Sequence, residues 1–192
     1  MKIVVCIKQV PGTSQVEIDP ETGVLKRDGA AAKINPYDLY ALETAMRLKE
    51  CCGGTVTAVT MGPPQAEAMM KEAYMMGVDQ AYVFTDRTFA GADVLATSYT
   101  LAQGITSICD YDIIICGKQT TDGDTAQVGP QIAEKLDLPQ VTYVEEFHIE
   151  DNLKDITVKR QLEDGYELIG IKTPCMLTAI KELNDPRYMN MK

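Results

Sequence analysis

The residues with the clearest chemical potential lie between Gly117 and Gly129, in the stretch GKQTTDGDTAQVG. This stretch follows the apolar run Ile113–Cys116, which is typical of a strand buried on both faces, and it leads into a helical pattern. The first amides of such a helix lack intrahelical partners and carry partial positive charge, so they can bind a phosphate. Gly123 and Gly129 would let a ligand come close to the backbone. The stretch therefore predicts a phosphate-binding loop, and a plain chain reversal is the alternative.

The loop contains neither of two common nucleotide motifs, because the chain has no Walker A sequence and no GxGxxG. Asp122 and Asp124 are unfavourable beside a phosphate, and their simplest interpretation is as helix N-caps. An enzyme that uses one of them as a base is a second hypothesis. The chain offers no Ser-His-Asp or Cys-His set around its single histidine, His148. These patterns favour a protein that holds a nucleotide without transforming it.

Composition excludes several classes of protein. The formal net charge is −10, which argues against nucleic acid and against an anionic membrane surface as partners. No apolar run approaches the roughly 18 residues that membrane insertion needs. The six cysteines form no C-x-x-C pair, as expected of free thiols in a cytoplasmic protein. A zinc site is improbable, since the chain has one histidine and no cysteine cluster beside it.

Strands and helices alternate over the first two thirds of the chain. Strand patterns at 2–8, 55–61, 81–85 and 112–117 are separated by helix patterns at about 35–50, 65–76 and 92–108. This order predicts an α/β fold with an open, mostly parallel, Rossmann-like sheet in three layers. From 140 to about 180 only strand patterns occur, at 141–149, 156–162, 166–171 and 175–180, with Asp164-Gly165 as a hairpin signal. We expect them to form an antiparallel extension of the same sheet.

We therefore expect a single nucleotide-binding domain over residues 1–192. Its βα units occupy 1–139, with a hairpin insertion at 12–34 in which Val16–Ile18 and Val24–Lys26 flank the turn DPETG. The antiparallel extension occupies 140–180. Residues 181–192 form a polar tail, which we interpret as truncated.

The carboxyl ends of parallel strands meet at one edge of a sheet, where open α/β folds bind ligands. Three segments follow such ends: Cys6 to Pro11, Met61 to Pro63, and the loop from Gly117 to Gly129. The helix start Asn35-Pro36-Tyr37-Asp38 would face the same crevice if the insertion returns the chain there. For each segment, a plain connection is the alternative.

Four of these segments also carry a family likeness: NPYDLYALETAMRLKE (35–50), VTMGPPQAE (59–67), GADVLATS (91–98) and GKQTTDGDTAQVGPQIAEKLDLPQVTYV (117–144). Together they resemble the β subunit of electron transfer flavoproteins, and the likeness runs in register from Met1 through LNDPRY (183–188). GADVLATS and GDTAQVGP are most similar to the bifurcating form with two FAD molecules. The family extends further at its C-terminus, so the resemblance implies a shortened chain, which puts docking of its partners in question.

The resemblance implies an electron carrier subunit more than a stand-alone catalyst. It would pair with an α subunit that carries a redox flavin, serve acyl-CoA-type dehydrogenases, and couple to NADH where the form bifurcates electrons. The β subunit would hold AMP or a second FAD. Carried over onto this sequence, the site comprises Cys6, Asn35, Pro36, Tyr37, Asp38, Met61, Gly123, Asp124, Thr125, Ala126, Gln127, Val128 and Gly129. The amides of 124–129 would cradle phosphate. An ATP- or AMP-binding regulatory module on a similar α/β fold is the alternative.

Overall fold

The computed structural model describes residues 1–12, 17–18, 25–26, 32–108 and 110–190. Within these ranges the strands are β1 (Lys2–Cys6), β2 (Gln9–Pro11), β3 (Glu17–Ile18), β4 (Leu25–Lys26), β5 (Ala32–Ile34), β6 (Thr55–Met61), β7 (Gln80–Phe84), β8 (Ile113–Gly117), β9 (Gln140–Ile149), β10 (Asp155–Leu162), β11 (Gly165–Lys172) and β12 (Cys175–Ala179). The helices are α1 (Pro36–Cys52), α2 (Glu67–Met76), α3 (Val94–Ile108) and α4 (Val128–Lys135). Short 3₁₀ turns lie at Pro64–Ala66, Arg87–Phe89 and Lys181–Leu183.

The main sheet has the strand order β11-β10-β9-β12-β8-β1-β6-β7 in the described part of the chain. The pairs from β9 through β12, β8, β1 and β6 to β7 are parallel, whereas β10 pairs antiparallel with both β9 and β11. The expected α/β fold, mostly parallel with an antiparallel C-terminal part, is confirmed.

One strand of the expected extension was placed wrongly. The segment 175–180 was expected to be antiparallel, but β12 lies inside the sheet and pairs parallel with both β8 and β9. All five of its residues are buried, as in a central strand covered on both faces. Only two residues separate β11 from β12. This short link carries the chain forward from the hairpin into the middle of the sheet.

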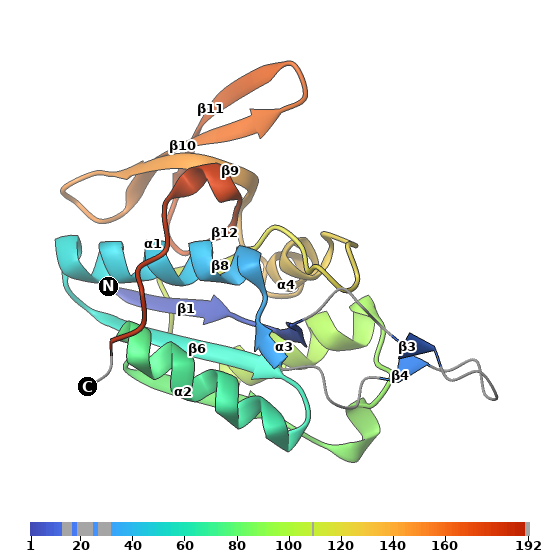
Figure 1. The fold of residues 1–192 in the computed structure, drawn as a ribbon. Coiled ribbons are helices and arrows are strands. Elements are labelled where there is room, and N and C mark those ends of the chain that lie inside the picture. Colours follow the sequence, from blue (N-terminus) through green and yellow to red (C-terminus); the bar gives the residue numbers. More distant parts are fainter. Residues whose placement is uncertain (13–16, 19–24, 27–31, 109, 191–192) are drawn as a thin grey trace.

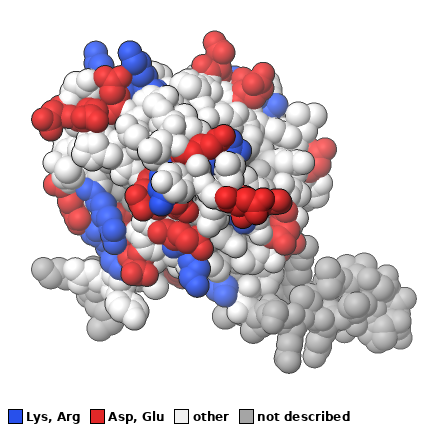
Figure 2. All heavy atoms as spheres, turned by 90° about the horizontal axis from the view of Figure 1, so that it is seen from above, with Lys and Arg blue, Asp and Glu red and all other residues white. Residues whose placement is uncertain are grey.

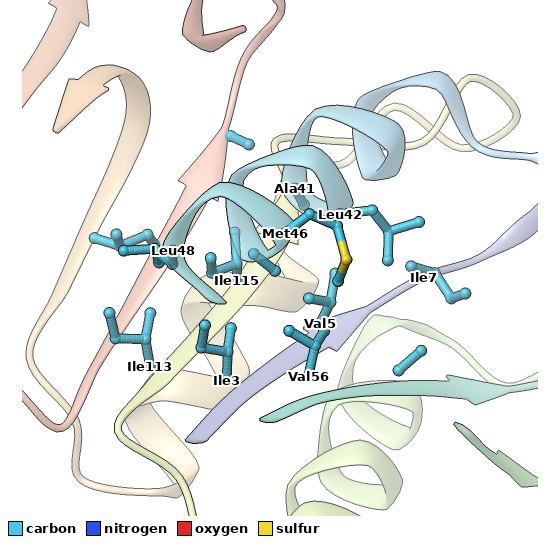
Figure 3. Packing of buried hydrophobic residues seen from close by; sticks show 14 of the residues in the cluster. Ile3, Val5, Ile7, Ala41, Leu42, Met46, Leu48, Val56, Ile113 and Ile115 are labelled. Atoms are coloured by element: carbon cyan, nitrogen blue, oxygen red, sulfur yellow. The ribbon is translucent and has the colours of Figure 1, made fainter. Parts of the chain in front are cut away.

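Helices cover both faces of the sheet and so make three layers (Figure 1). Ile3 and Val5 of β1 face α1 and α2, whereas Val4 and Cys6 face α3 and α4. This alternation follows from the two-residue period of a strand. On the first face, apolar side chains of α1 point toward those of β1, β6 and β8 (Figure 3). The position of α1 in turn fixes its first turn beside the ends of β1 and β8.

The boundaries of α1 follow local signals in the sequence. Pro36 occupies the first turn of α1, where its missing N–H leaves no hydrogen bond unmade. The helix ends at Cys52, before Gly53, whose φ of 68° favours glycine. Both ends match the expected helix.

Parts of the expected insertion at 12–34 are described. β2 pairs antiparallel with β5, and β3 pairs antiparallel with β4. The expected turn at 19–23, together with Val16 and Val24, lies outside the described residues.

The tail packs against α1, although its sequence shows no terminating element. Asn184 Nδ2 donates to Thr44 Oγ1 at 2.7 Å, and Arg187 Nε donates to Glu43 Oε2 at 2.7 Å. Asn190 N donates to Met75 O at 2.9 Å, which carries the tail on to α2. These partners are far away in sequence and were therefore invisible in a local pattern.

None of the helices in the described part is both long and apolar enough to cross a membrane. On the face shown in Figure 2, Lys and Arg side chains lie interspersed with Asp and Glu. Ion pairs such as Lys159–Glu145, at 2.7 Å, connect neighbouring strands.

Candidate functional site

The candidate site lies at the carboxyl edge of the parallel strands, where the ends of β1, β6 and β8 meet. Cys6 is the last residue of β1 and pairs in register with Cys116 of β8. Met61 ends β6 and is partly buried against the α3/α4 side of the core. The first turn of α1 and the segment from 118 to 127 adjoin this edge. The structure thus brings the expected segments to one edge of the sheet.

Asp38 joins three of these elements from a buried position. Its Oδ2 accepts a hydrogen bond from Lys8 N at 2.7 Å, and its Oδ1 accepts one from Gly117 N at 3.2 Å. Burial raises the pKa of Asp38 to about 7, against opposing hydrogen bonds that lower it. Gly117 is required here, because a Cβ at that position would collide with the Asp38 carboxyl group and with Tyr37.

Asn35 acts on the loop instead of capping α1. It occupies the N-cap position, but its side chain makes no cap hydrogen bond. Instead, Asn35 Nδ2 donates to Gln119 O at 2.9 Å, and its Oδ1 accepts from Thr121 N at 3.2 Å. Its side chain is fully buried, so both polar atoms need these partners. The start of α1 thereby fixes the first half of the loop.

The interpretation of Asp122 and Asp124 as helix caps is wrong. The N-cap of α4 is Gln127, and no side chain caps that helix. Asp122 instead pairs with Lys8 Nζ at 2.7 Å, and Asp124 Oδ1 accepts a hydrogen bond from Gln119 Nε2. Burial raises the pKa of Asp122, but hydrogen bonds from Lys8 and Thr120 outweigh it, so the net shift is downward. A carboxylate with a lowered pKa is a poor general base, which weakens the enzyme hypothesis.

The second half of the loop presents backbone amides. The amides of residues 125–129 donate to no acceptor within the described part of the chain, whereas Asp124 N donates to Thr120 O at 3.0 Å. Asp124 and Ala126 have φ values of 54° and 53°, in the left-handed region. Left-handed residues alternating with others turn successive amides toward a common point, a geometry that binds anions. The expected cradle of 124–129 thus has free amides except at Asp124.

The remaining expected site residues fall into two groups. Gly123, Thr125 and Gln127 are exposed in the loop. Val128 and Gly129 instead pack inward: Val128 lies against the core, and a Cβ on Gly129 would come within 3.0 Å of Thr178 Cγ2. Packing therefore explains the glycine at position 129, since the missing side chain lets the start of α4 approach β12.

Sequence reasoning missed two lysines of this edge. Lys8 follows β1 and holds Asp122 through both carboxylate oxygens, at 2.7 and 2.8 Å. Lys118 follows β8, and its ammonium lies 5.8 Å from the ring centre of Tyr37. Both positions follow the carboxyl ends of expected parallel strands, which was the signal that could have identified them.

A phosphate-bearing cofactor fits this arrangement. The free amides of 125–129 lie at the start of α4, whose dipole places partial positive charge there. The carboxylates of Asp122 and Asp124 are each held by a partner within the protein. No group of three or more potential metal ligands occurs among the described residues. The donor set is thus one of amides and lysines, which suits an anion.

Comparison with known proteins gives a family for this chain. A model of the electron transfer flavoprotein domain matches residues 22–192. The electron transfer flavoprotein subunit beta of Thermoanaerobacterium thermosaccharolyticum is 57% identical over the whole chain, which covers 73% of that protein.

Two relatives are named as parts of reductase complexes. Subunit CarD of the caffeyl-CoA reductase-Etf complex of Acetobacterium woodii is 54% identical over the whole chain, which covers 72% of that protein. The acryloyl-CoA reductase electron transfer subunit gamma of Anaerotignum propionicum is 48% identical, again over the whole chain, which covers 72% of that protein.

Proposed function

Because the chain belongs to the electron transfer flavoprotein family, as a β subunit, we propose that it holds an adenine nucleotide at the carboxyl edge of its sheet. The nucleotide is FAD or AMP, and the α subunit of the same flavoprotein covers the site. The pair then passes electrons between dehydrogenases and acceptors. In this role the chain is an electron carrier subunit of the cytoplasm.

The loop backbone is the observation that carries this proposal. The amides of 125–129 have no acceptor within the described residues, and they stand at the start of an uncapped helix. An unpaired amide is costly where water is excluded, so a phosphate at this place satisfies donors that the fold leaves open. Asn35 and Asp38 hold the loop and the strand ends in place from the other side.

In this proposal, the expected site residues have different tasks. The amides of Thr125, Ala126, Gln127, Val128 and Gly129 bind phosphate. Asn35, Pro36, Tyr37 and Asp38 shape the crevice and position the loop, and Cys6 and Met61 provide its apolar floor. The fully buried Cys116 beside Cys6 stays a thiol, since its hydrogen bond with Cys6 and its burial raise its pKa well above the usual value. When FAD is bound, its flavin accepts and returns electrons.

The names of the relatives support a flavoprotein role beside CoA-ester enzymes. One of them is named as a subunit of a caffeyl-CoA reductase-Etf complex, and another as an electron transfer subunit of an acryloyl-CoA reductase. We extend the proposal accordingly to acyl-CoA-type dehydrogenases as partners and to NADH-linked electron bifurcation, in which this subunit carries the second FAD.

Purification with the α subunit tests the proposal. We expect the heterodimer to bind AMP or FAD in calorimetric titration, and flavin counting to give either two FAD, or one FAD plus AMP. Failure to bind AMP or FAD, with the α subunit present, would overturn it. ATP bound more tightly than AMP or FAD, without a flavin-bearing partner, would favour the regulatory module instead.

A further inference from the structure

Lys118 is a cation that the protein holds in place without neutralising it. Its ammonium lies 5.8 Å from the ring centre of Tyr37 and 5.2 Å from that of Tyr143. No carboxylate of the described residues forms an ion pair with it, in contrast to Lys8, which Asp122 neutralises. Ring faces attract a cation through their quadrupoles and restrict its movement, but they carry no net charge. The positive charge of Lys118 thus remains available.

Tyr143 reaches Lys118 because β9 is distorted at this point. The register between β9 and β12 shifts here, and Tyr143 has a φ of 57°, which is unfavourable for a bulky side chain. Its amide donates to Thr178 Oγ1 at 3.0 Å, a side-chain acceptor in place of a regular ladder partner. Backbone strain of this kind persists where surrounding structure requires it, and it is concentrated at functional sites. We interpret the irregularity as the device that directs the ring toward Lys118.

The nearby acidic groups have other partners. The Asp38 carboxyl group accepts from two backbone amides, and among the described residues Lys8 is the cation whose charge lowers its pKa. Asp122 pairs with Lys8, and Asp124 with Gln119. Lys118 itself is anchored by its amide, which donates to Ala179 O at 2.9 Å, and it opens the loop that presents the free amides. A ligand anion at this edge would therefore find Lys118 without a competing carboxylate.

We propose that Lys118, held between Tyr37 and Tyr143, contacts a phosphate group of the nucleotide and makes the site selective for phosphorylated ligands. This inference rests on the proposed function and deepens it. The amides of 125–129 orient the phosphate group, and Lys118 provides a full positive charge beside it. Tyr37 and Tyr143 are positioning residues that act through the lysine.

The test compares AMP with adenosine on the α–β heterodimer, since the two ligands differ only in the phosphate. For Lys118→Met we expect AMP affinity to fall about 10- to 100-fold, the range for a lost charge-assisted hydrogen bond. Adenosine affinity should change less than about twofold, because no phosphate contact is lost. Lys135→Met is the matched control, because this half-buried lysine lies at the opposite end of α4 and should leave both affinities unchanged.

A second measurement does not depend on affinity. The ³¹P resonance of AMP at saturation should differ between the wild type and Lys118→Met, and an unchanged resonance would overturn the inference.

Tyr143→Leu should weaken AMP binding by roughly two- to fivefold, since one cation–π contact is lost. Parallel loss of AMP and adenosine, or weaker α-subunit binding with unchanged AMP affinity, would also overturn it. If the wild type bound neither AMP nor FAD, the proposed function itself would fail; tight AMP binding by Lys118→Met would remove only this inference.

Discussion

Two buried acids on α1, Asp38 in its first turn and Glu43 in its middle, have opposite electrostatic surroundings. They are 4% and 3% exposed, respectively. Burial raises the pKa of Asp38 to about 7, and it outweighs the hydrogen bonds from the Asn35 side chain and from the backbone amides of Lys8 and Gly117, which favour the carboxylate. Burial also raises the pKa of Glu43, but hydrogen bonds from Arg187 and Arg47 outweigh it and leave a net lowering. The same helix therefore holds one acid with a strong counter-ion and one without.

This difference assigns different roles to the two acids of α1, stability alone to Glu43, and ligand binding as well as stability to Asp38. A buried carboxylate without a close counter-ion is energetically costly, and such groups are frequent at binding sites. Asp38 lies beside the candidate loop, whereas the Glu43–Arg187 pair fastens the tail to the middle of the helix. We therefore expect changes around Glu43 to affect stability alone, and changes around Asp38 to affect nucleotide binding as well.

The largest effect is expected for Arg187→Met. This change leaves Glu43 buried with Arg47 as its remaining cation, and removing one partner of such a pair is strongly destabilising. We expect a loss of about 3 kcal/mol in the free energy of unfolding, measured with urea. AMP affinity of the folded heterodimer should remain unchanged. Lys71→Met is the control, because its pair with Glu67 is exposed and should contribute less than about 0.5 kcal/mol.

Gly117→Ala should have the second largest effect. Its added methyl group would meet the Asp38 carboxyl group and the Tyr37 backbone, neither of which can move without disturbing the first turn of α1. We expect a loss of about 2 kcal/mol in the free energy of unfolding, as for other overpacked sites, together with weaker AMP binding. Gly170→Ala is the matched control, since its methyl group would meet nothing within 4 Å. Equal effects of the two substitutions would contradict the proposed role of Gly117.

The Arg187–Glu43 and Gly117–Asp38 contacts also show which features of this fold cannot be predicted from local sequence patterns. The alternation of strands and helices, the start of α1 at Pro36 and its end before Gly53 all follow from local signals. The position of β12 does not, because a strand's neighbours depend on pairings across the whole chain. Likewise, Arg187 lies 144 residues from Glu43, and no periodicity reports such a contact.

The candidate site likewise has features that the sequence predicts and features that it does not. The glycine-bearing loop after β8 could be recognised from its residue types, and so could the edge of the sheet at which it lies. The partners of Asn35 could not, since Gln119 lies 84 residues away and the usual role of Asn at a helix start is capping. The left-handed backbone at Ala126 was equally hidden, because alanine rarely adopts it.

The third prediction concerns the pH dependence that Asp38 contributes. Its pKa is about 7 in the folded protein, against 3.8 for an unperturbed aspartate, so between these values the folded state binds a proton that the unfolded state lacks. Stability is therefore lost as the pH rises through this window and is constant above it. Relative to Asp38→Asn, the wild type should lose about 1 to 2 kcal/mol of unfolding free energy between about pH 5.5 and about pH 7. Urea titrations of both proteins measure this difference, in which the other carboxylates cancel.

A difference that stays constant, or that increases with pH, would contradict the raised pKa of Asp38. Glu43→Gln is the matched comparison on the same helix. Because the pKa of Glu43 is lowered, its contribution to stability is present at neutral pH and is lost on acidification. The two variants should therefore show opposite slopes against pH.

The smallest effect on stability is expected for Gly123→Val. Gly123 is exposed in the loop, and an added Cβ would meet only Thr120 Oγ1, at 3.3 Å. The free energy of unfolding should therefore change by less than about 0.5 kcal/mol, as for most surface substitutions. AMP and FAD binding should nevertheless be blocked, because the branched side chain stands where the ligand approaches the free amides of 125–129. Gly170→Val, on an exposed strand with room for the side chain, should leave both properties unchanged. Loss of cooperative unfolding in Gly123→Val would instead make this glycine a structural residue, and the loop would then resemble the Glu43 region more than the Asp38 region.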